Sequence, residues 1–428
     1  MLMGTPTVTR ITGREVLDCR GLPTVQVDVA LDSGVLGRAD VPAGRSTGRR
    51  EAKELRDGGH RYRGLGVAGA VGNVRGPIAE ALVGTAIGSI HEADDLLRAL
   101  DGTTDKSKLG ANAICGVSLA VARALAAHHG LPLYRFLAAG AHVLPTPQVN
   151  LINGGLHASN DLDFQEFIVM PVGAPSMAEA LRMSTEINLA LGEILVERYG
   201  KAAVNVGDEG GYAPPVSDPE EALALLHEAV EGSGYEGMVR YGLDCAASHF
   251  YDASSSTYRV AGADYDRDAL IGLYADLAAR FDVVSIEDPL HEDDAEGFAE
   301  VTRRLGIQIV GDDFLVTDPA RVDEASRRGS ASALLLKVNQ IGTLTEALAA
   351  ADAAHRGGMA VVVSERSGET EDAMIADLSV ALGAGQIKTG APVRGERTAK
   401  YNRLLQIEEE LGTAARYAGA GAVRPRLS

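Results

Sequence analysis

Short apolar runs that end in a charged residue recur through the second half of the chain, and they limit its possible folds more than any other feature. These runs occupy residues 283–288, 307–313, 333–340, 360–366 and 386–388. Continuous runs rich in Val, Ile and Leu are typical of parallel strands that are buried on both faces. The segments between them, such as residues 268–281, 343–355 and 372–382, carry apolar residues three or four positions apart, which predicts amphipathic helices.

Strands and helices that alternate in this way predict an α/β fold, a (β/α)8 barrel. In such barrels the catalytic groups lie at the carboxyl ends of the strands. The charged residues that end the apolar runs are therefore the first candidates for a catalytic site.

The first third of the chain has a different pattern. Residues 24–30 alternate as a strand does, and residues 32–34 have the composition of a hairpin turn. Helical patterns follow at 76–83, 90–100 and 111–129. We therefore expect an α+β domain over residues 1–137 and a barrel domain over residues 138–428.

The net charge argues against two classes of partner. The 428 residues include 40 basic and 59 acidic side chains, which gives a net charge of −19. Nucleic acids and anionic membranes bind basic surfaces, so neither is expected, whereas local lysines and arginines can still capture a small anionic substrate. The first residues have no secretory pattern, and we identify no apolar stretch of membrane-spanning length. A cytoplasmic protein is expected.

Three carboxylates follow predicted strands: Asp244, Glu287 and Asp312. At the same end of one barrel they would converge, and three like charges repel unless a cation neutralises them. Carboxylate oxygens are the ligands that Mg²⁺ prefers. Each acid alone could equally be a solvated loop residue or a helix cap, but three at matched positions favour a magnesium site.

Further polar groups complete a candidate catalytic set. Lys337 and Lys388 also end strands, and a lysine beside another cation can have a lowered pKa and act as a base. Glu209 lies among glycines at 207–211, so it is a candidate proton donor, with a plain turn as the alternative. His157, Gln165 and Glu166 add polar side chains on loops. Such a set could remove a proton next to a carboxylate and protonate a leaving hydroxyl.

Seven motifs resemble those of the enolase family, and the resemblance runs nearly from end to end. They lie at residues 13–21, 54–58, 110–114, 207–211, 285–289, 368–372 and 385–390. The resemblance implies an N-terminal α+β domain, a barrel that begins ββαα, and a homodimer.

The resemblance also implies roles for single residues. Asp244, Glu287 and Asp312 would hold Mg²⁺, Lys337 would be the base, and Glu209 the acid, assisted by Glu166. Lys388 would meet the substrate carboxylate, and Arg366 and Ser367 the phosphoryl group. Gln165 would contact the substrate too, and His157 would close over it on a mobile loop.

Two segments depart from the family pattern. Where the family reads Ser-Gly-Ala-Ser-Thr, this chain has Ala43, Gly44, Arg45, Ser46 and Thr47, and where the family has Ser-His-Arg-Ser, Glu365 replaces the histidine. Arg45 could bind an extra anionic group on the substrate. This leads us to prefer a specialised branch of the family, carboxyphosphonoenolpyruvate synthase of phosphinate antibiotic biosynthesis. The alternatives are an ordinary enolase acting on 2-phosphoglycerate and a catalytically weak binding protein.

Overall fold

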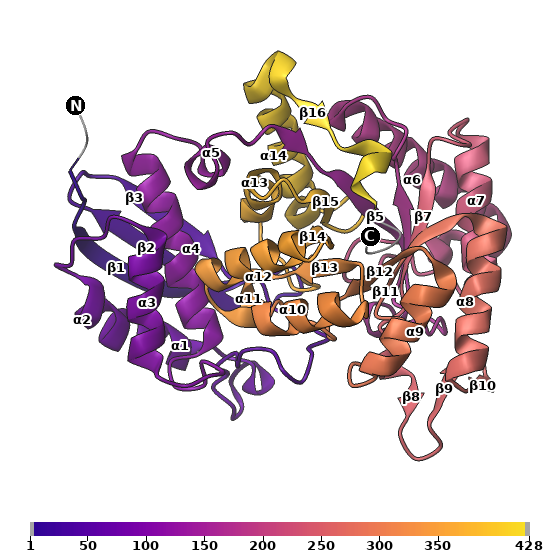
Figure 1. The fold of residues 1–428 in the computed structure, drawn as a ribbon, viewed down its shortest axis with the longest axis horizontal. Coiled ribbons are helices and arrows are strands. Elements are labelled where there is room, and N and C mark those ends of the chain that lie inside the picture. The colour runs from indigo at the N-terminus through magenta and orange to yellow at the C-terminus, as the bar shows by residue number, and fades with distance from the viewer. Residues whose placement is uncertain (1–3, 424–428) are drawn as a thin grey trace.

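The protein is described here from a computed structural model that covers residues 4–423. Figure 1 shows an N-terminal domain beside a larger barrel. The N-terminal domain contains an antiparallel sheet with the order β1-β2-β3, in which β1 is Val8–Leu17, β2 is Pro23–Leu31 and β3 is Leu36–Asp40. Its helices are α1 (Ala68–Asn73), α2 (Ala79–Leu82), α3 (Ile90–Asp101), α4 (Ala111–His128) and α5 (Leu133–Leu137).

Helix α4 is the core helix of this domain. It packs on β2 and β3, and nearly all its residues are buried. It is also long and apolar enough to cross a membrane, although the sequence analysis identified no such stretch. However, 89% of this apolar segment is buried inside the protein. A core helix passes the same test of length and composition, so α4 is weak evidence for a membrane span.

Eight strands close into the predicted barrel, in the order β11-β12-β13-β14-β15-β5-β6-β7. They are β5 (Thr146–Asn153), β6 (Glu166–Met170), β7 (Arg240–Asp244), β11 (Val283–Glu287), β12 (Gln308–Gly311), β13 (Ala333–Leu336), β14 (Ala360–Ser364) and β15 (Gly385–Lys388). Strand β6 runs antiparallel to both neighbours, and the other pairs are parallel. The predicted α/β fold is confirmed.

Long helices connect the strands and pack around the barrel (Figure 1). They are α6 (Met177–Tyr199), α7 (Pro219–Gly232), α8 (Arg267–Phe281), α9 (Ala295–Leu305), α10 (Pro319–Arg328), α12 (Leu344–Arg356), α13 (Met374–Ala381) and α14 (Gly395–Leu411). Since α6 and α7 both follow β6, the barrel begins ββαα, as the resemblance implies. Short elements complete it: β4 (Val143–Leu144), β8 (Tyr251–Asp252), β9 (Thr257–Val260), β10 (Ala263–Tyr265), α11 (Val338–Ile341) and β16 (Arg416–Tyr417).

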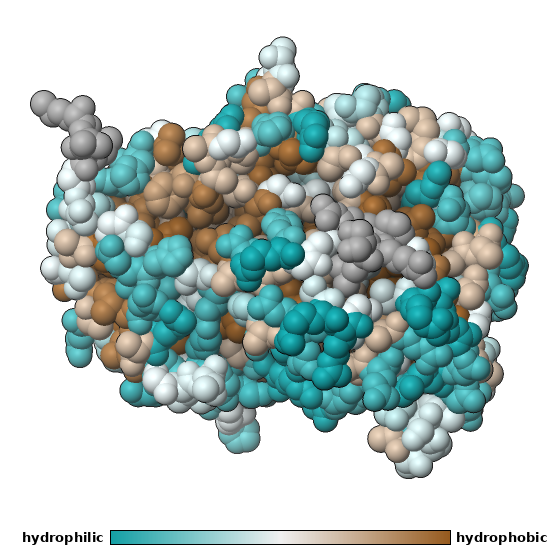
Figure 2. Space-filling view, in the orientation of Figure 1, coloured by the Kyte–Doolittle hydropathy of each residue, from teal (hydrophilic) through white to brown (hydrophobic). Residues whose placement is uncertain are grey.

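The outer faces of the barrel helices are polar because their apolar stripes face inward. Figure 2 shows hydrophilic residues over the helices at the lower centre and right of this view, while hydrophobic residues gather over the N-terminal domain and its junction with the barrel. The loop after β3 crosses this junction. Ala43 and Gly368 exchange two backbone hydrogen bonds of 2.9 Å, which bring the loop to the end of β14.

Candidate active site

The register of the strands places the candidate residues at one rim of the barrel. Glu287, the last residue of β11, pairs with Asp244, the last of β7, and Asp244 pairs in turn with Glu166, the first residue of the antiparallel strand β6. Lys388 ends β15, and Lys337 follows β13 directly. The carboxyl ends of the parallel strands and the amino end of β6 therefore present these side chains together.

Lys388 lies at the centre of a group of carboxylates. Its Nζ is 3.0 Å from Asp244 Oδ2, 2.8 Å from Glu287 Oε2 and 3.1 Å from Glu166 Oε1, and the side chain is 3% exposed. Burial opposes the charge of this amine, but the three carboxylates outweigh it, and the pKa of Lys388 is raised well above its usual value. The ammonium therefore neutralises part of the acidic group.

Lys337 forms a second ion pair beside the first. Its Nζ is 2.5 Å from Asp312 Oδ2, and Gln340 donates to the other oxygen of Asp312 at 2.7 Å. Burial lowers the pKa of Lys337, but the negative charges of Asp312 and Glu287 raise it, and the net shift is upward. The lowered pKa that we expected for this lysine is absent among these contacts, although Arg366 and Lys388 do act in that direction.

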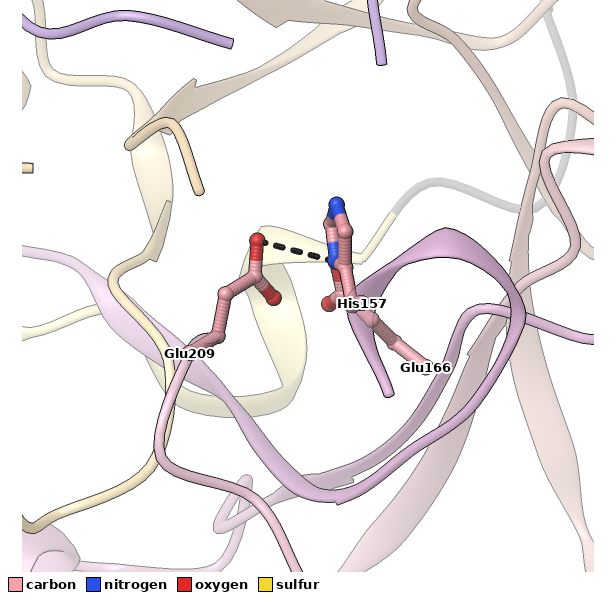
Figure 3. A group of neighbouring side chains, drawn as sticks. All are labelled: His157, Glu166 and Glu209. Atoms are coloured by element: carbon pink, nitrogen blue, oxygen red, sulfur yellow. Dashed lines mark ion pairs between the residues drawn. The ribbon is translucent and has the colours of Figure 1, made fainter. Parts of the chain in front are cut away.

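Glu209, His157 and Glu166 form a third group (Figure 3). Nδ1 of His157 is 3.2 Å from Glu209 Oε1 and 3.7 Å from Glu166 Oε1, and Asn150 donates to Glu209 Oε2 at 2.9 Å. Burial raises the pKa of Glu209, but the charge and hydrogen bond of His157 lower it below the usual value. Burial and the charge of Glu209 raise the pKa of Glu166. Two neighbouring carboxyls whose pKa values are pushed apart are typical of acid–base sites.

Arg366 and Ser367 connect the loop after β3 to the barrel. The Arg366 guanidinium makes two contacts with Glu51, at 3.0 and 3.1 Å, and donates to the Ser46 carbonyl at 3.0 Å. Ser367 Oγ accepts a hydrogen bond from the backbone N–H of Arg45 at 2.7 Å. The loop is thereby closed over this part of the rim.

Arg45 contacts residues other than the carboxylates around Lys388. Its Nε is 3.0 Å from Asp208 Oδ2, its NH1 donates to the Leu156 carbonyl at 2.9 Å, and the side chain is half exposed. Beyond it lies a cavity of about 580 Å³ whose walls include Arg45, His157 and Asp208. Arg45 therefore forms part of the wall of this cavity, together with His157 of the buried site. A direct contact between Arg45 and a substrate stays a prediction.

Two residues of this region gave no sequence signal. Glu51 lies in a polar loop and pairs with Arg366, and Arg397 lies in the first turn of α14. Charged side chains at such places are usually solvated, but Arg397 is completely buried and pairs with Glu365. Their partners are distant in sequence, so spacing could not reveal either pair. Gln165 lies where it was expected, and its Nε2 donates to Asp244 Oδ2 at 3.2 Å.

Several buried polar atoms of the site have no hydrogen-bond partner within residues 4–423. They include His157 Nε2, Gln165 Oε1, Glu166 Oε2, Glu287 Oε1, Glu365 Oε1 and Thr389 Oγ1. An unsatisfied buried polar group costs about 1–3 kcal/mol. So many at one place indicate a site shaped for a polar ligand.

The acidic donor set fits Mg²⁺. Burial and the charge of Asp244 raise the pKa of Glu287 well above its usual value, and its Oε1 lacks a partner in the described part of the chain. A divalent cation would remove both costs. The residues that lie close enough together to share a metal ion differ, however, from the predicted trio of Asp244, Glu287 and Asp312. They are His157 with Glu166 and Glu209, and Asp288 with Asp312 and Asp313. In the trio, Asp244 and Glu287 face each other across Lys388.

Comparison with known proteins identifies the family. A profile described as "Enolase, N-terminal domain" matches residues 8–137, and one described as "Enolase, C-terminal TIM barrel domain" matches residues 141–426. The curated protein "Enolase" of Methanopyrus kandleri is 56% identical over 417 residues, which are 96% of this chain and 98% of that protein. "Enolase" of Thermococcus gammatolerans is 54% identical over 98% of this chain and 99% of its own length, and that of Pyrococcus furiosus 55% over 96% of both.

These relatives contradict our preference for carboxyphosphonoenolpyruvate synthase. Proteins that share more than half of their residues with this chain over nearly its full length are named enolase, so the alternative of an ordinary enolase fits better. The preference gave too much weight to three substitutions, at Ala43, Arg45 and Glu365, and the Arg45 guanidinium on which it relied contacts Asp208 and the Leu156 carbonyl. The chain belongs to the enolase family, and it is an enzyme of hydro-lyase chemistry with Mg²⁺ as its cofactor.

Proposed function

We propose that this protein is an enolase that converts 2-phosphoglycerate to phosphoenolpyruvate and water. The main support for this proposal is that two groups of side chains lie at the same closed rim of the barrel. In one group Lys337 pairs with Asp312, and in the other Glu209 lies with His157 and Glu166. The first group offers a base and the second an acid. The names of the relatives support the same substrate.

The reaction needs one proton removed and one supplied. Lys337, after losing the proton that its pairing with Asp312 favours, takes the proton from C2 of the substrate. Glu209, which His157 keeps ionised, must first take up a proton; it then gives this proton to the hydroxyl on C3, and the bond between C3 and that oxygen breaks to release water. Glu166, whose raised pKa keeps a proton nearby, assists Glu209.

The remaining residues bind and orient the substrate. Lys388 meets its carboxylate, Arg366 and Ser367 hold the phosphoryl group, and His157 and Gln165 close the site from the loop side. Asp244, Glu287 and Asp312 would hold Mg²⁺, which supplies positive charge opposite the carboxylate as negative charge builds up there. Burial strengthens these interactions because little water remains to screen them.

The direct test is a spectrophotometric assay that follows formation of the enolpyruvate product. We expect Mg²⁺-dependent turnover of 2-phosphoglycerate by the protein, its loss with EDTA, and its loss in Lys337→Met. Lys108→Met, at an exposed lysine far from the rim, is the control and should keep full activity. A folded protein that binds Mg²⁺ and 2-phosphoglycerate in calorimetry but converts none of it would instead be a binding protein, and the proposal would be rejected.

We also propose that the enzyme works in the cytoplasm as a homodimer. The family resemblance and the burial of α4 support this proposal. Light scattering coupled to size-exclusion chromatography tests the assembly, and a monomeric mass at micromolar concentration would contradict it.

A further inference from the structure

Glu365 carries one tightly held carboxyl oxygen and one that is unused. It follows β14 directly, its backbone N–H donates to the Lys388 carbonyl at 3.0 Å, and it is 2% exposed. Its Oε2 forms an ion pair with Arg397 NH1. Its Oε1 has no hydrogen-bond partner in the part of the chain that the structure describes. A buried oxygen left in this way is costly unless a ligand uses it.

Arg397 ties Glu365 to the rest of the site. Its guanidinium also donates to the carbonyls of Arg366 at 2.9 Å, Ser367 at 2.8 Å and Asp208 at 3.0 Å. These three carbonyls belong to the segments that present the phosphoryl-binding residues and the proposed acid, Glu209. Because a guanidinium is planar and rigid, it fixes the carboxyl plane of Glu365 relative to both segments.

The unused oxygen faces the backbone of Glu209 across Gly390. A Cβ at Gly390 would lie 3.2 Å from Glu365 Oε1 and 2.5 Å from the Glu209 carbonyl oxygen, and the φ of this glycine is +83°. Only glycine leaves this space open. Oε1 is therefore buried near the backbone of Glu209, the proposed acid, rather than exposed to solvent.

The surroundings favour the protonated form of this carboxyl. Burial raises the pKa of Glu365 to about 8; Arg397 opposes the shift, and the charges of Glu209 and Glu369 add to it. Tyr401, which with Arg397 belongs to α14, is a further titratable group that interacts with it. Since Oε2 accepts from Arg397, the proton resides on Oε1. A carboxylic acid that its site keeps neutral can serve as a hydrogen-bond donor.

We propose that Glu365 is a specificity-determining residue for the proposed dehydration: Arg397 fixes its Oε2, so that its Oε1 donates a hydrogen bond to the C3 end of the substrate beside Glu209. This inference rests on the proposed function. At the position where the family motif has histidine, this chain offers a donor without a positive charge. Above about pH 8 the carboxyl ionises, loses its donor and repels the negative charges nearby.

Two variants test the donor. Glu365→Gln keeps an acceptor for Arg397 and a permanent N–H donor, so we expect kcat/KM at pH 7 within a few-fold of the parent and no fall of activity near pH 8. Glu365→Leu has neither group and should lose about a hundredfold in kcat/KM, as removal of a positioned donor does. Glu369→Gln, at a buried acid of the same loop that pairs with Lys400, is the control: it should keep an alkaline fall, moved to lower pH because the charge of Glu369 helps to raise the pKa of Glu365. An alkaline fall that persists unchanged in Glu365→Gln would overturn the inference, as would parental activity in Glu365→Leu.

A measurement without turnover separates this inference from the proposed function. A carboxyl whose pKa rises on folding stabilises the protein below its unfolded value of 4.5, and that contribution is lost as the pH rises towards 8. The stability of the parent relative to Glu365→Gln should therefore fall between pH 5 and 8, and a constant difference overturns the inference. If this fall is found but 2-phosphoglycerate is not converted, the proposed function fails. Calorimetry with 2-phosphoglycerate and Mg²⁺ then decides: a tenfold weaker affinity of Glu365→Leu supports the contact, and equal affinities overturn it.

Discussion

Removing the Lys388 ammonium tests how the acidic group at the rim is balanced. Three buried carboxylates, of Asp244, Glu287 and Glu166, lie within 3.1 Å of its Nζ. Methionine has a similar length and no charge, so Lys388→Met leaves these carboxylates without that cation. Breaking a buried ion pair by removing one partner costs about 3–5 kcal/mol. We therefore expect Lys388→Met to lose that much unfolding free energy in EDTA.

The loss should depend on both pH and Mg²⁺. The pKa values of Glu287 and Glu166 are already raised in the folded protein, and without the ammonium they rise further. A raised folded pKa means that stability is kept at low pH and lost as the pH rises, so the deficit of Lys388→Met should be larger at pH 8 than at pH 5. Mg²⁺ at a hundredfold excess over its dissociation constant adds about 2.7 kcal/mol to the folded state. Because the variant lacks the ammonium that competes with Mg²⁺ for these carboxylates, it should bind Mg²⁺ more tightly than the parent and so recover part of the deficit.

Urea unfolding followed by circular dichroism, in EDTA and in saturating Mg²⁺, provides the assay. Lys400→Met is the matched control, because Lys400 is also a buried lysine with one carboxylate partner, Glu369 at 2.9 Å, but lies outside the acidic group. Its deficit should be the same with and without Mg²⁺. A deficit of Lys388→Met that changes neither with Mg²⁺ nor between pH 5 and pH 8 would refute the reasoning.

Three further predictions concern catalysis. Lys337→Ala should lower kcat by about 10²–10⁴ and leave KM within a few-fold of the parent, because a base contributes to the transition state and not to substrate binding. Steady-state assays test this, and a changed KM with the parental kcat would contradict it. Glu209→Gln should stop turnover but keep exchange of the substrate C2 proton with deuterium from solvent, measured by NMR; loss of both would mean that the acid and base are not separate. Arg45→Ala should raise KM less than about fivefold, because the half-exposed ion pair of Arg45 with Asp208 contributes roughly 0.2–1 kcal/mol. Initial rates measured over a range of substrate concentrations test this, and a KM raised a hundredfold would indicate direct substrate contact.

The sequence predicted the barrel because buried parallel strands have a local signature. The runs before Glu287 and Lys337 are largely apolar, and the structure shows both runs as strands, with Glu287 at the end of β11 and Lys337 directly after β13. The antiparallel direction of β6 was not predicted, and Glu166, which we expected on a loop, is the first residue of this strand. Whether the domains divide between residues 137 and 138 stays a prediction.

Pairs that join distant segments could not be predicted from spacing. Arg366 is separated from Glu51 by 315 residues, and neither position shows in the sequence that it is buried. The two lysines were expected to depress each other's pKa, because only their common rim could be deduced. Their carboxylate partners, Asp312 for Lys337 and three acids for Lys388, decide the opposite direction.

The charged side chains of the site explain why it can both bind a metal ion and supply protons. The carboxyls of Asp244, Glu287, Asp312 and Glu166 outnumber the two lysines that contact them, so protons must remain on some carboxyls until a cation replaces them. A carboxyl that still holds a proton is a usable acid. Asp312, whose pKa is lowered by Lys337, stays ionised and suits a cation, whereas burial raises the pKa of Glu166 and of Glu365, so that these two carboxyls keep the protons that a dehydration consumes.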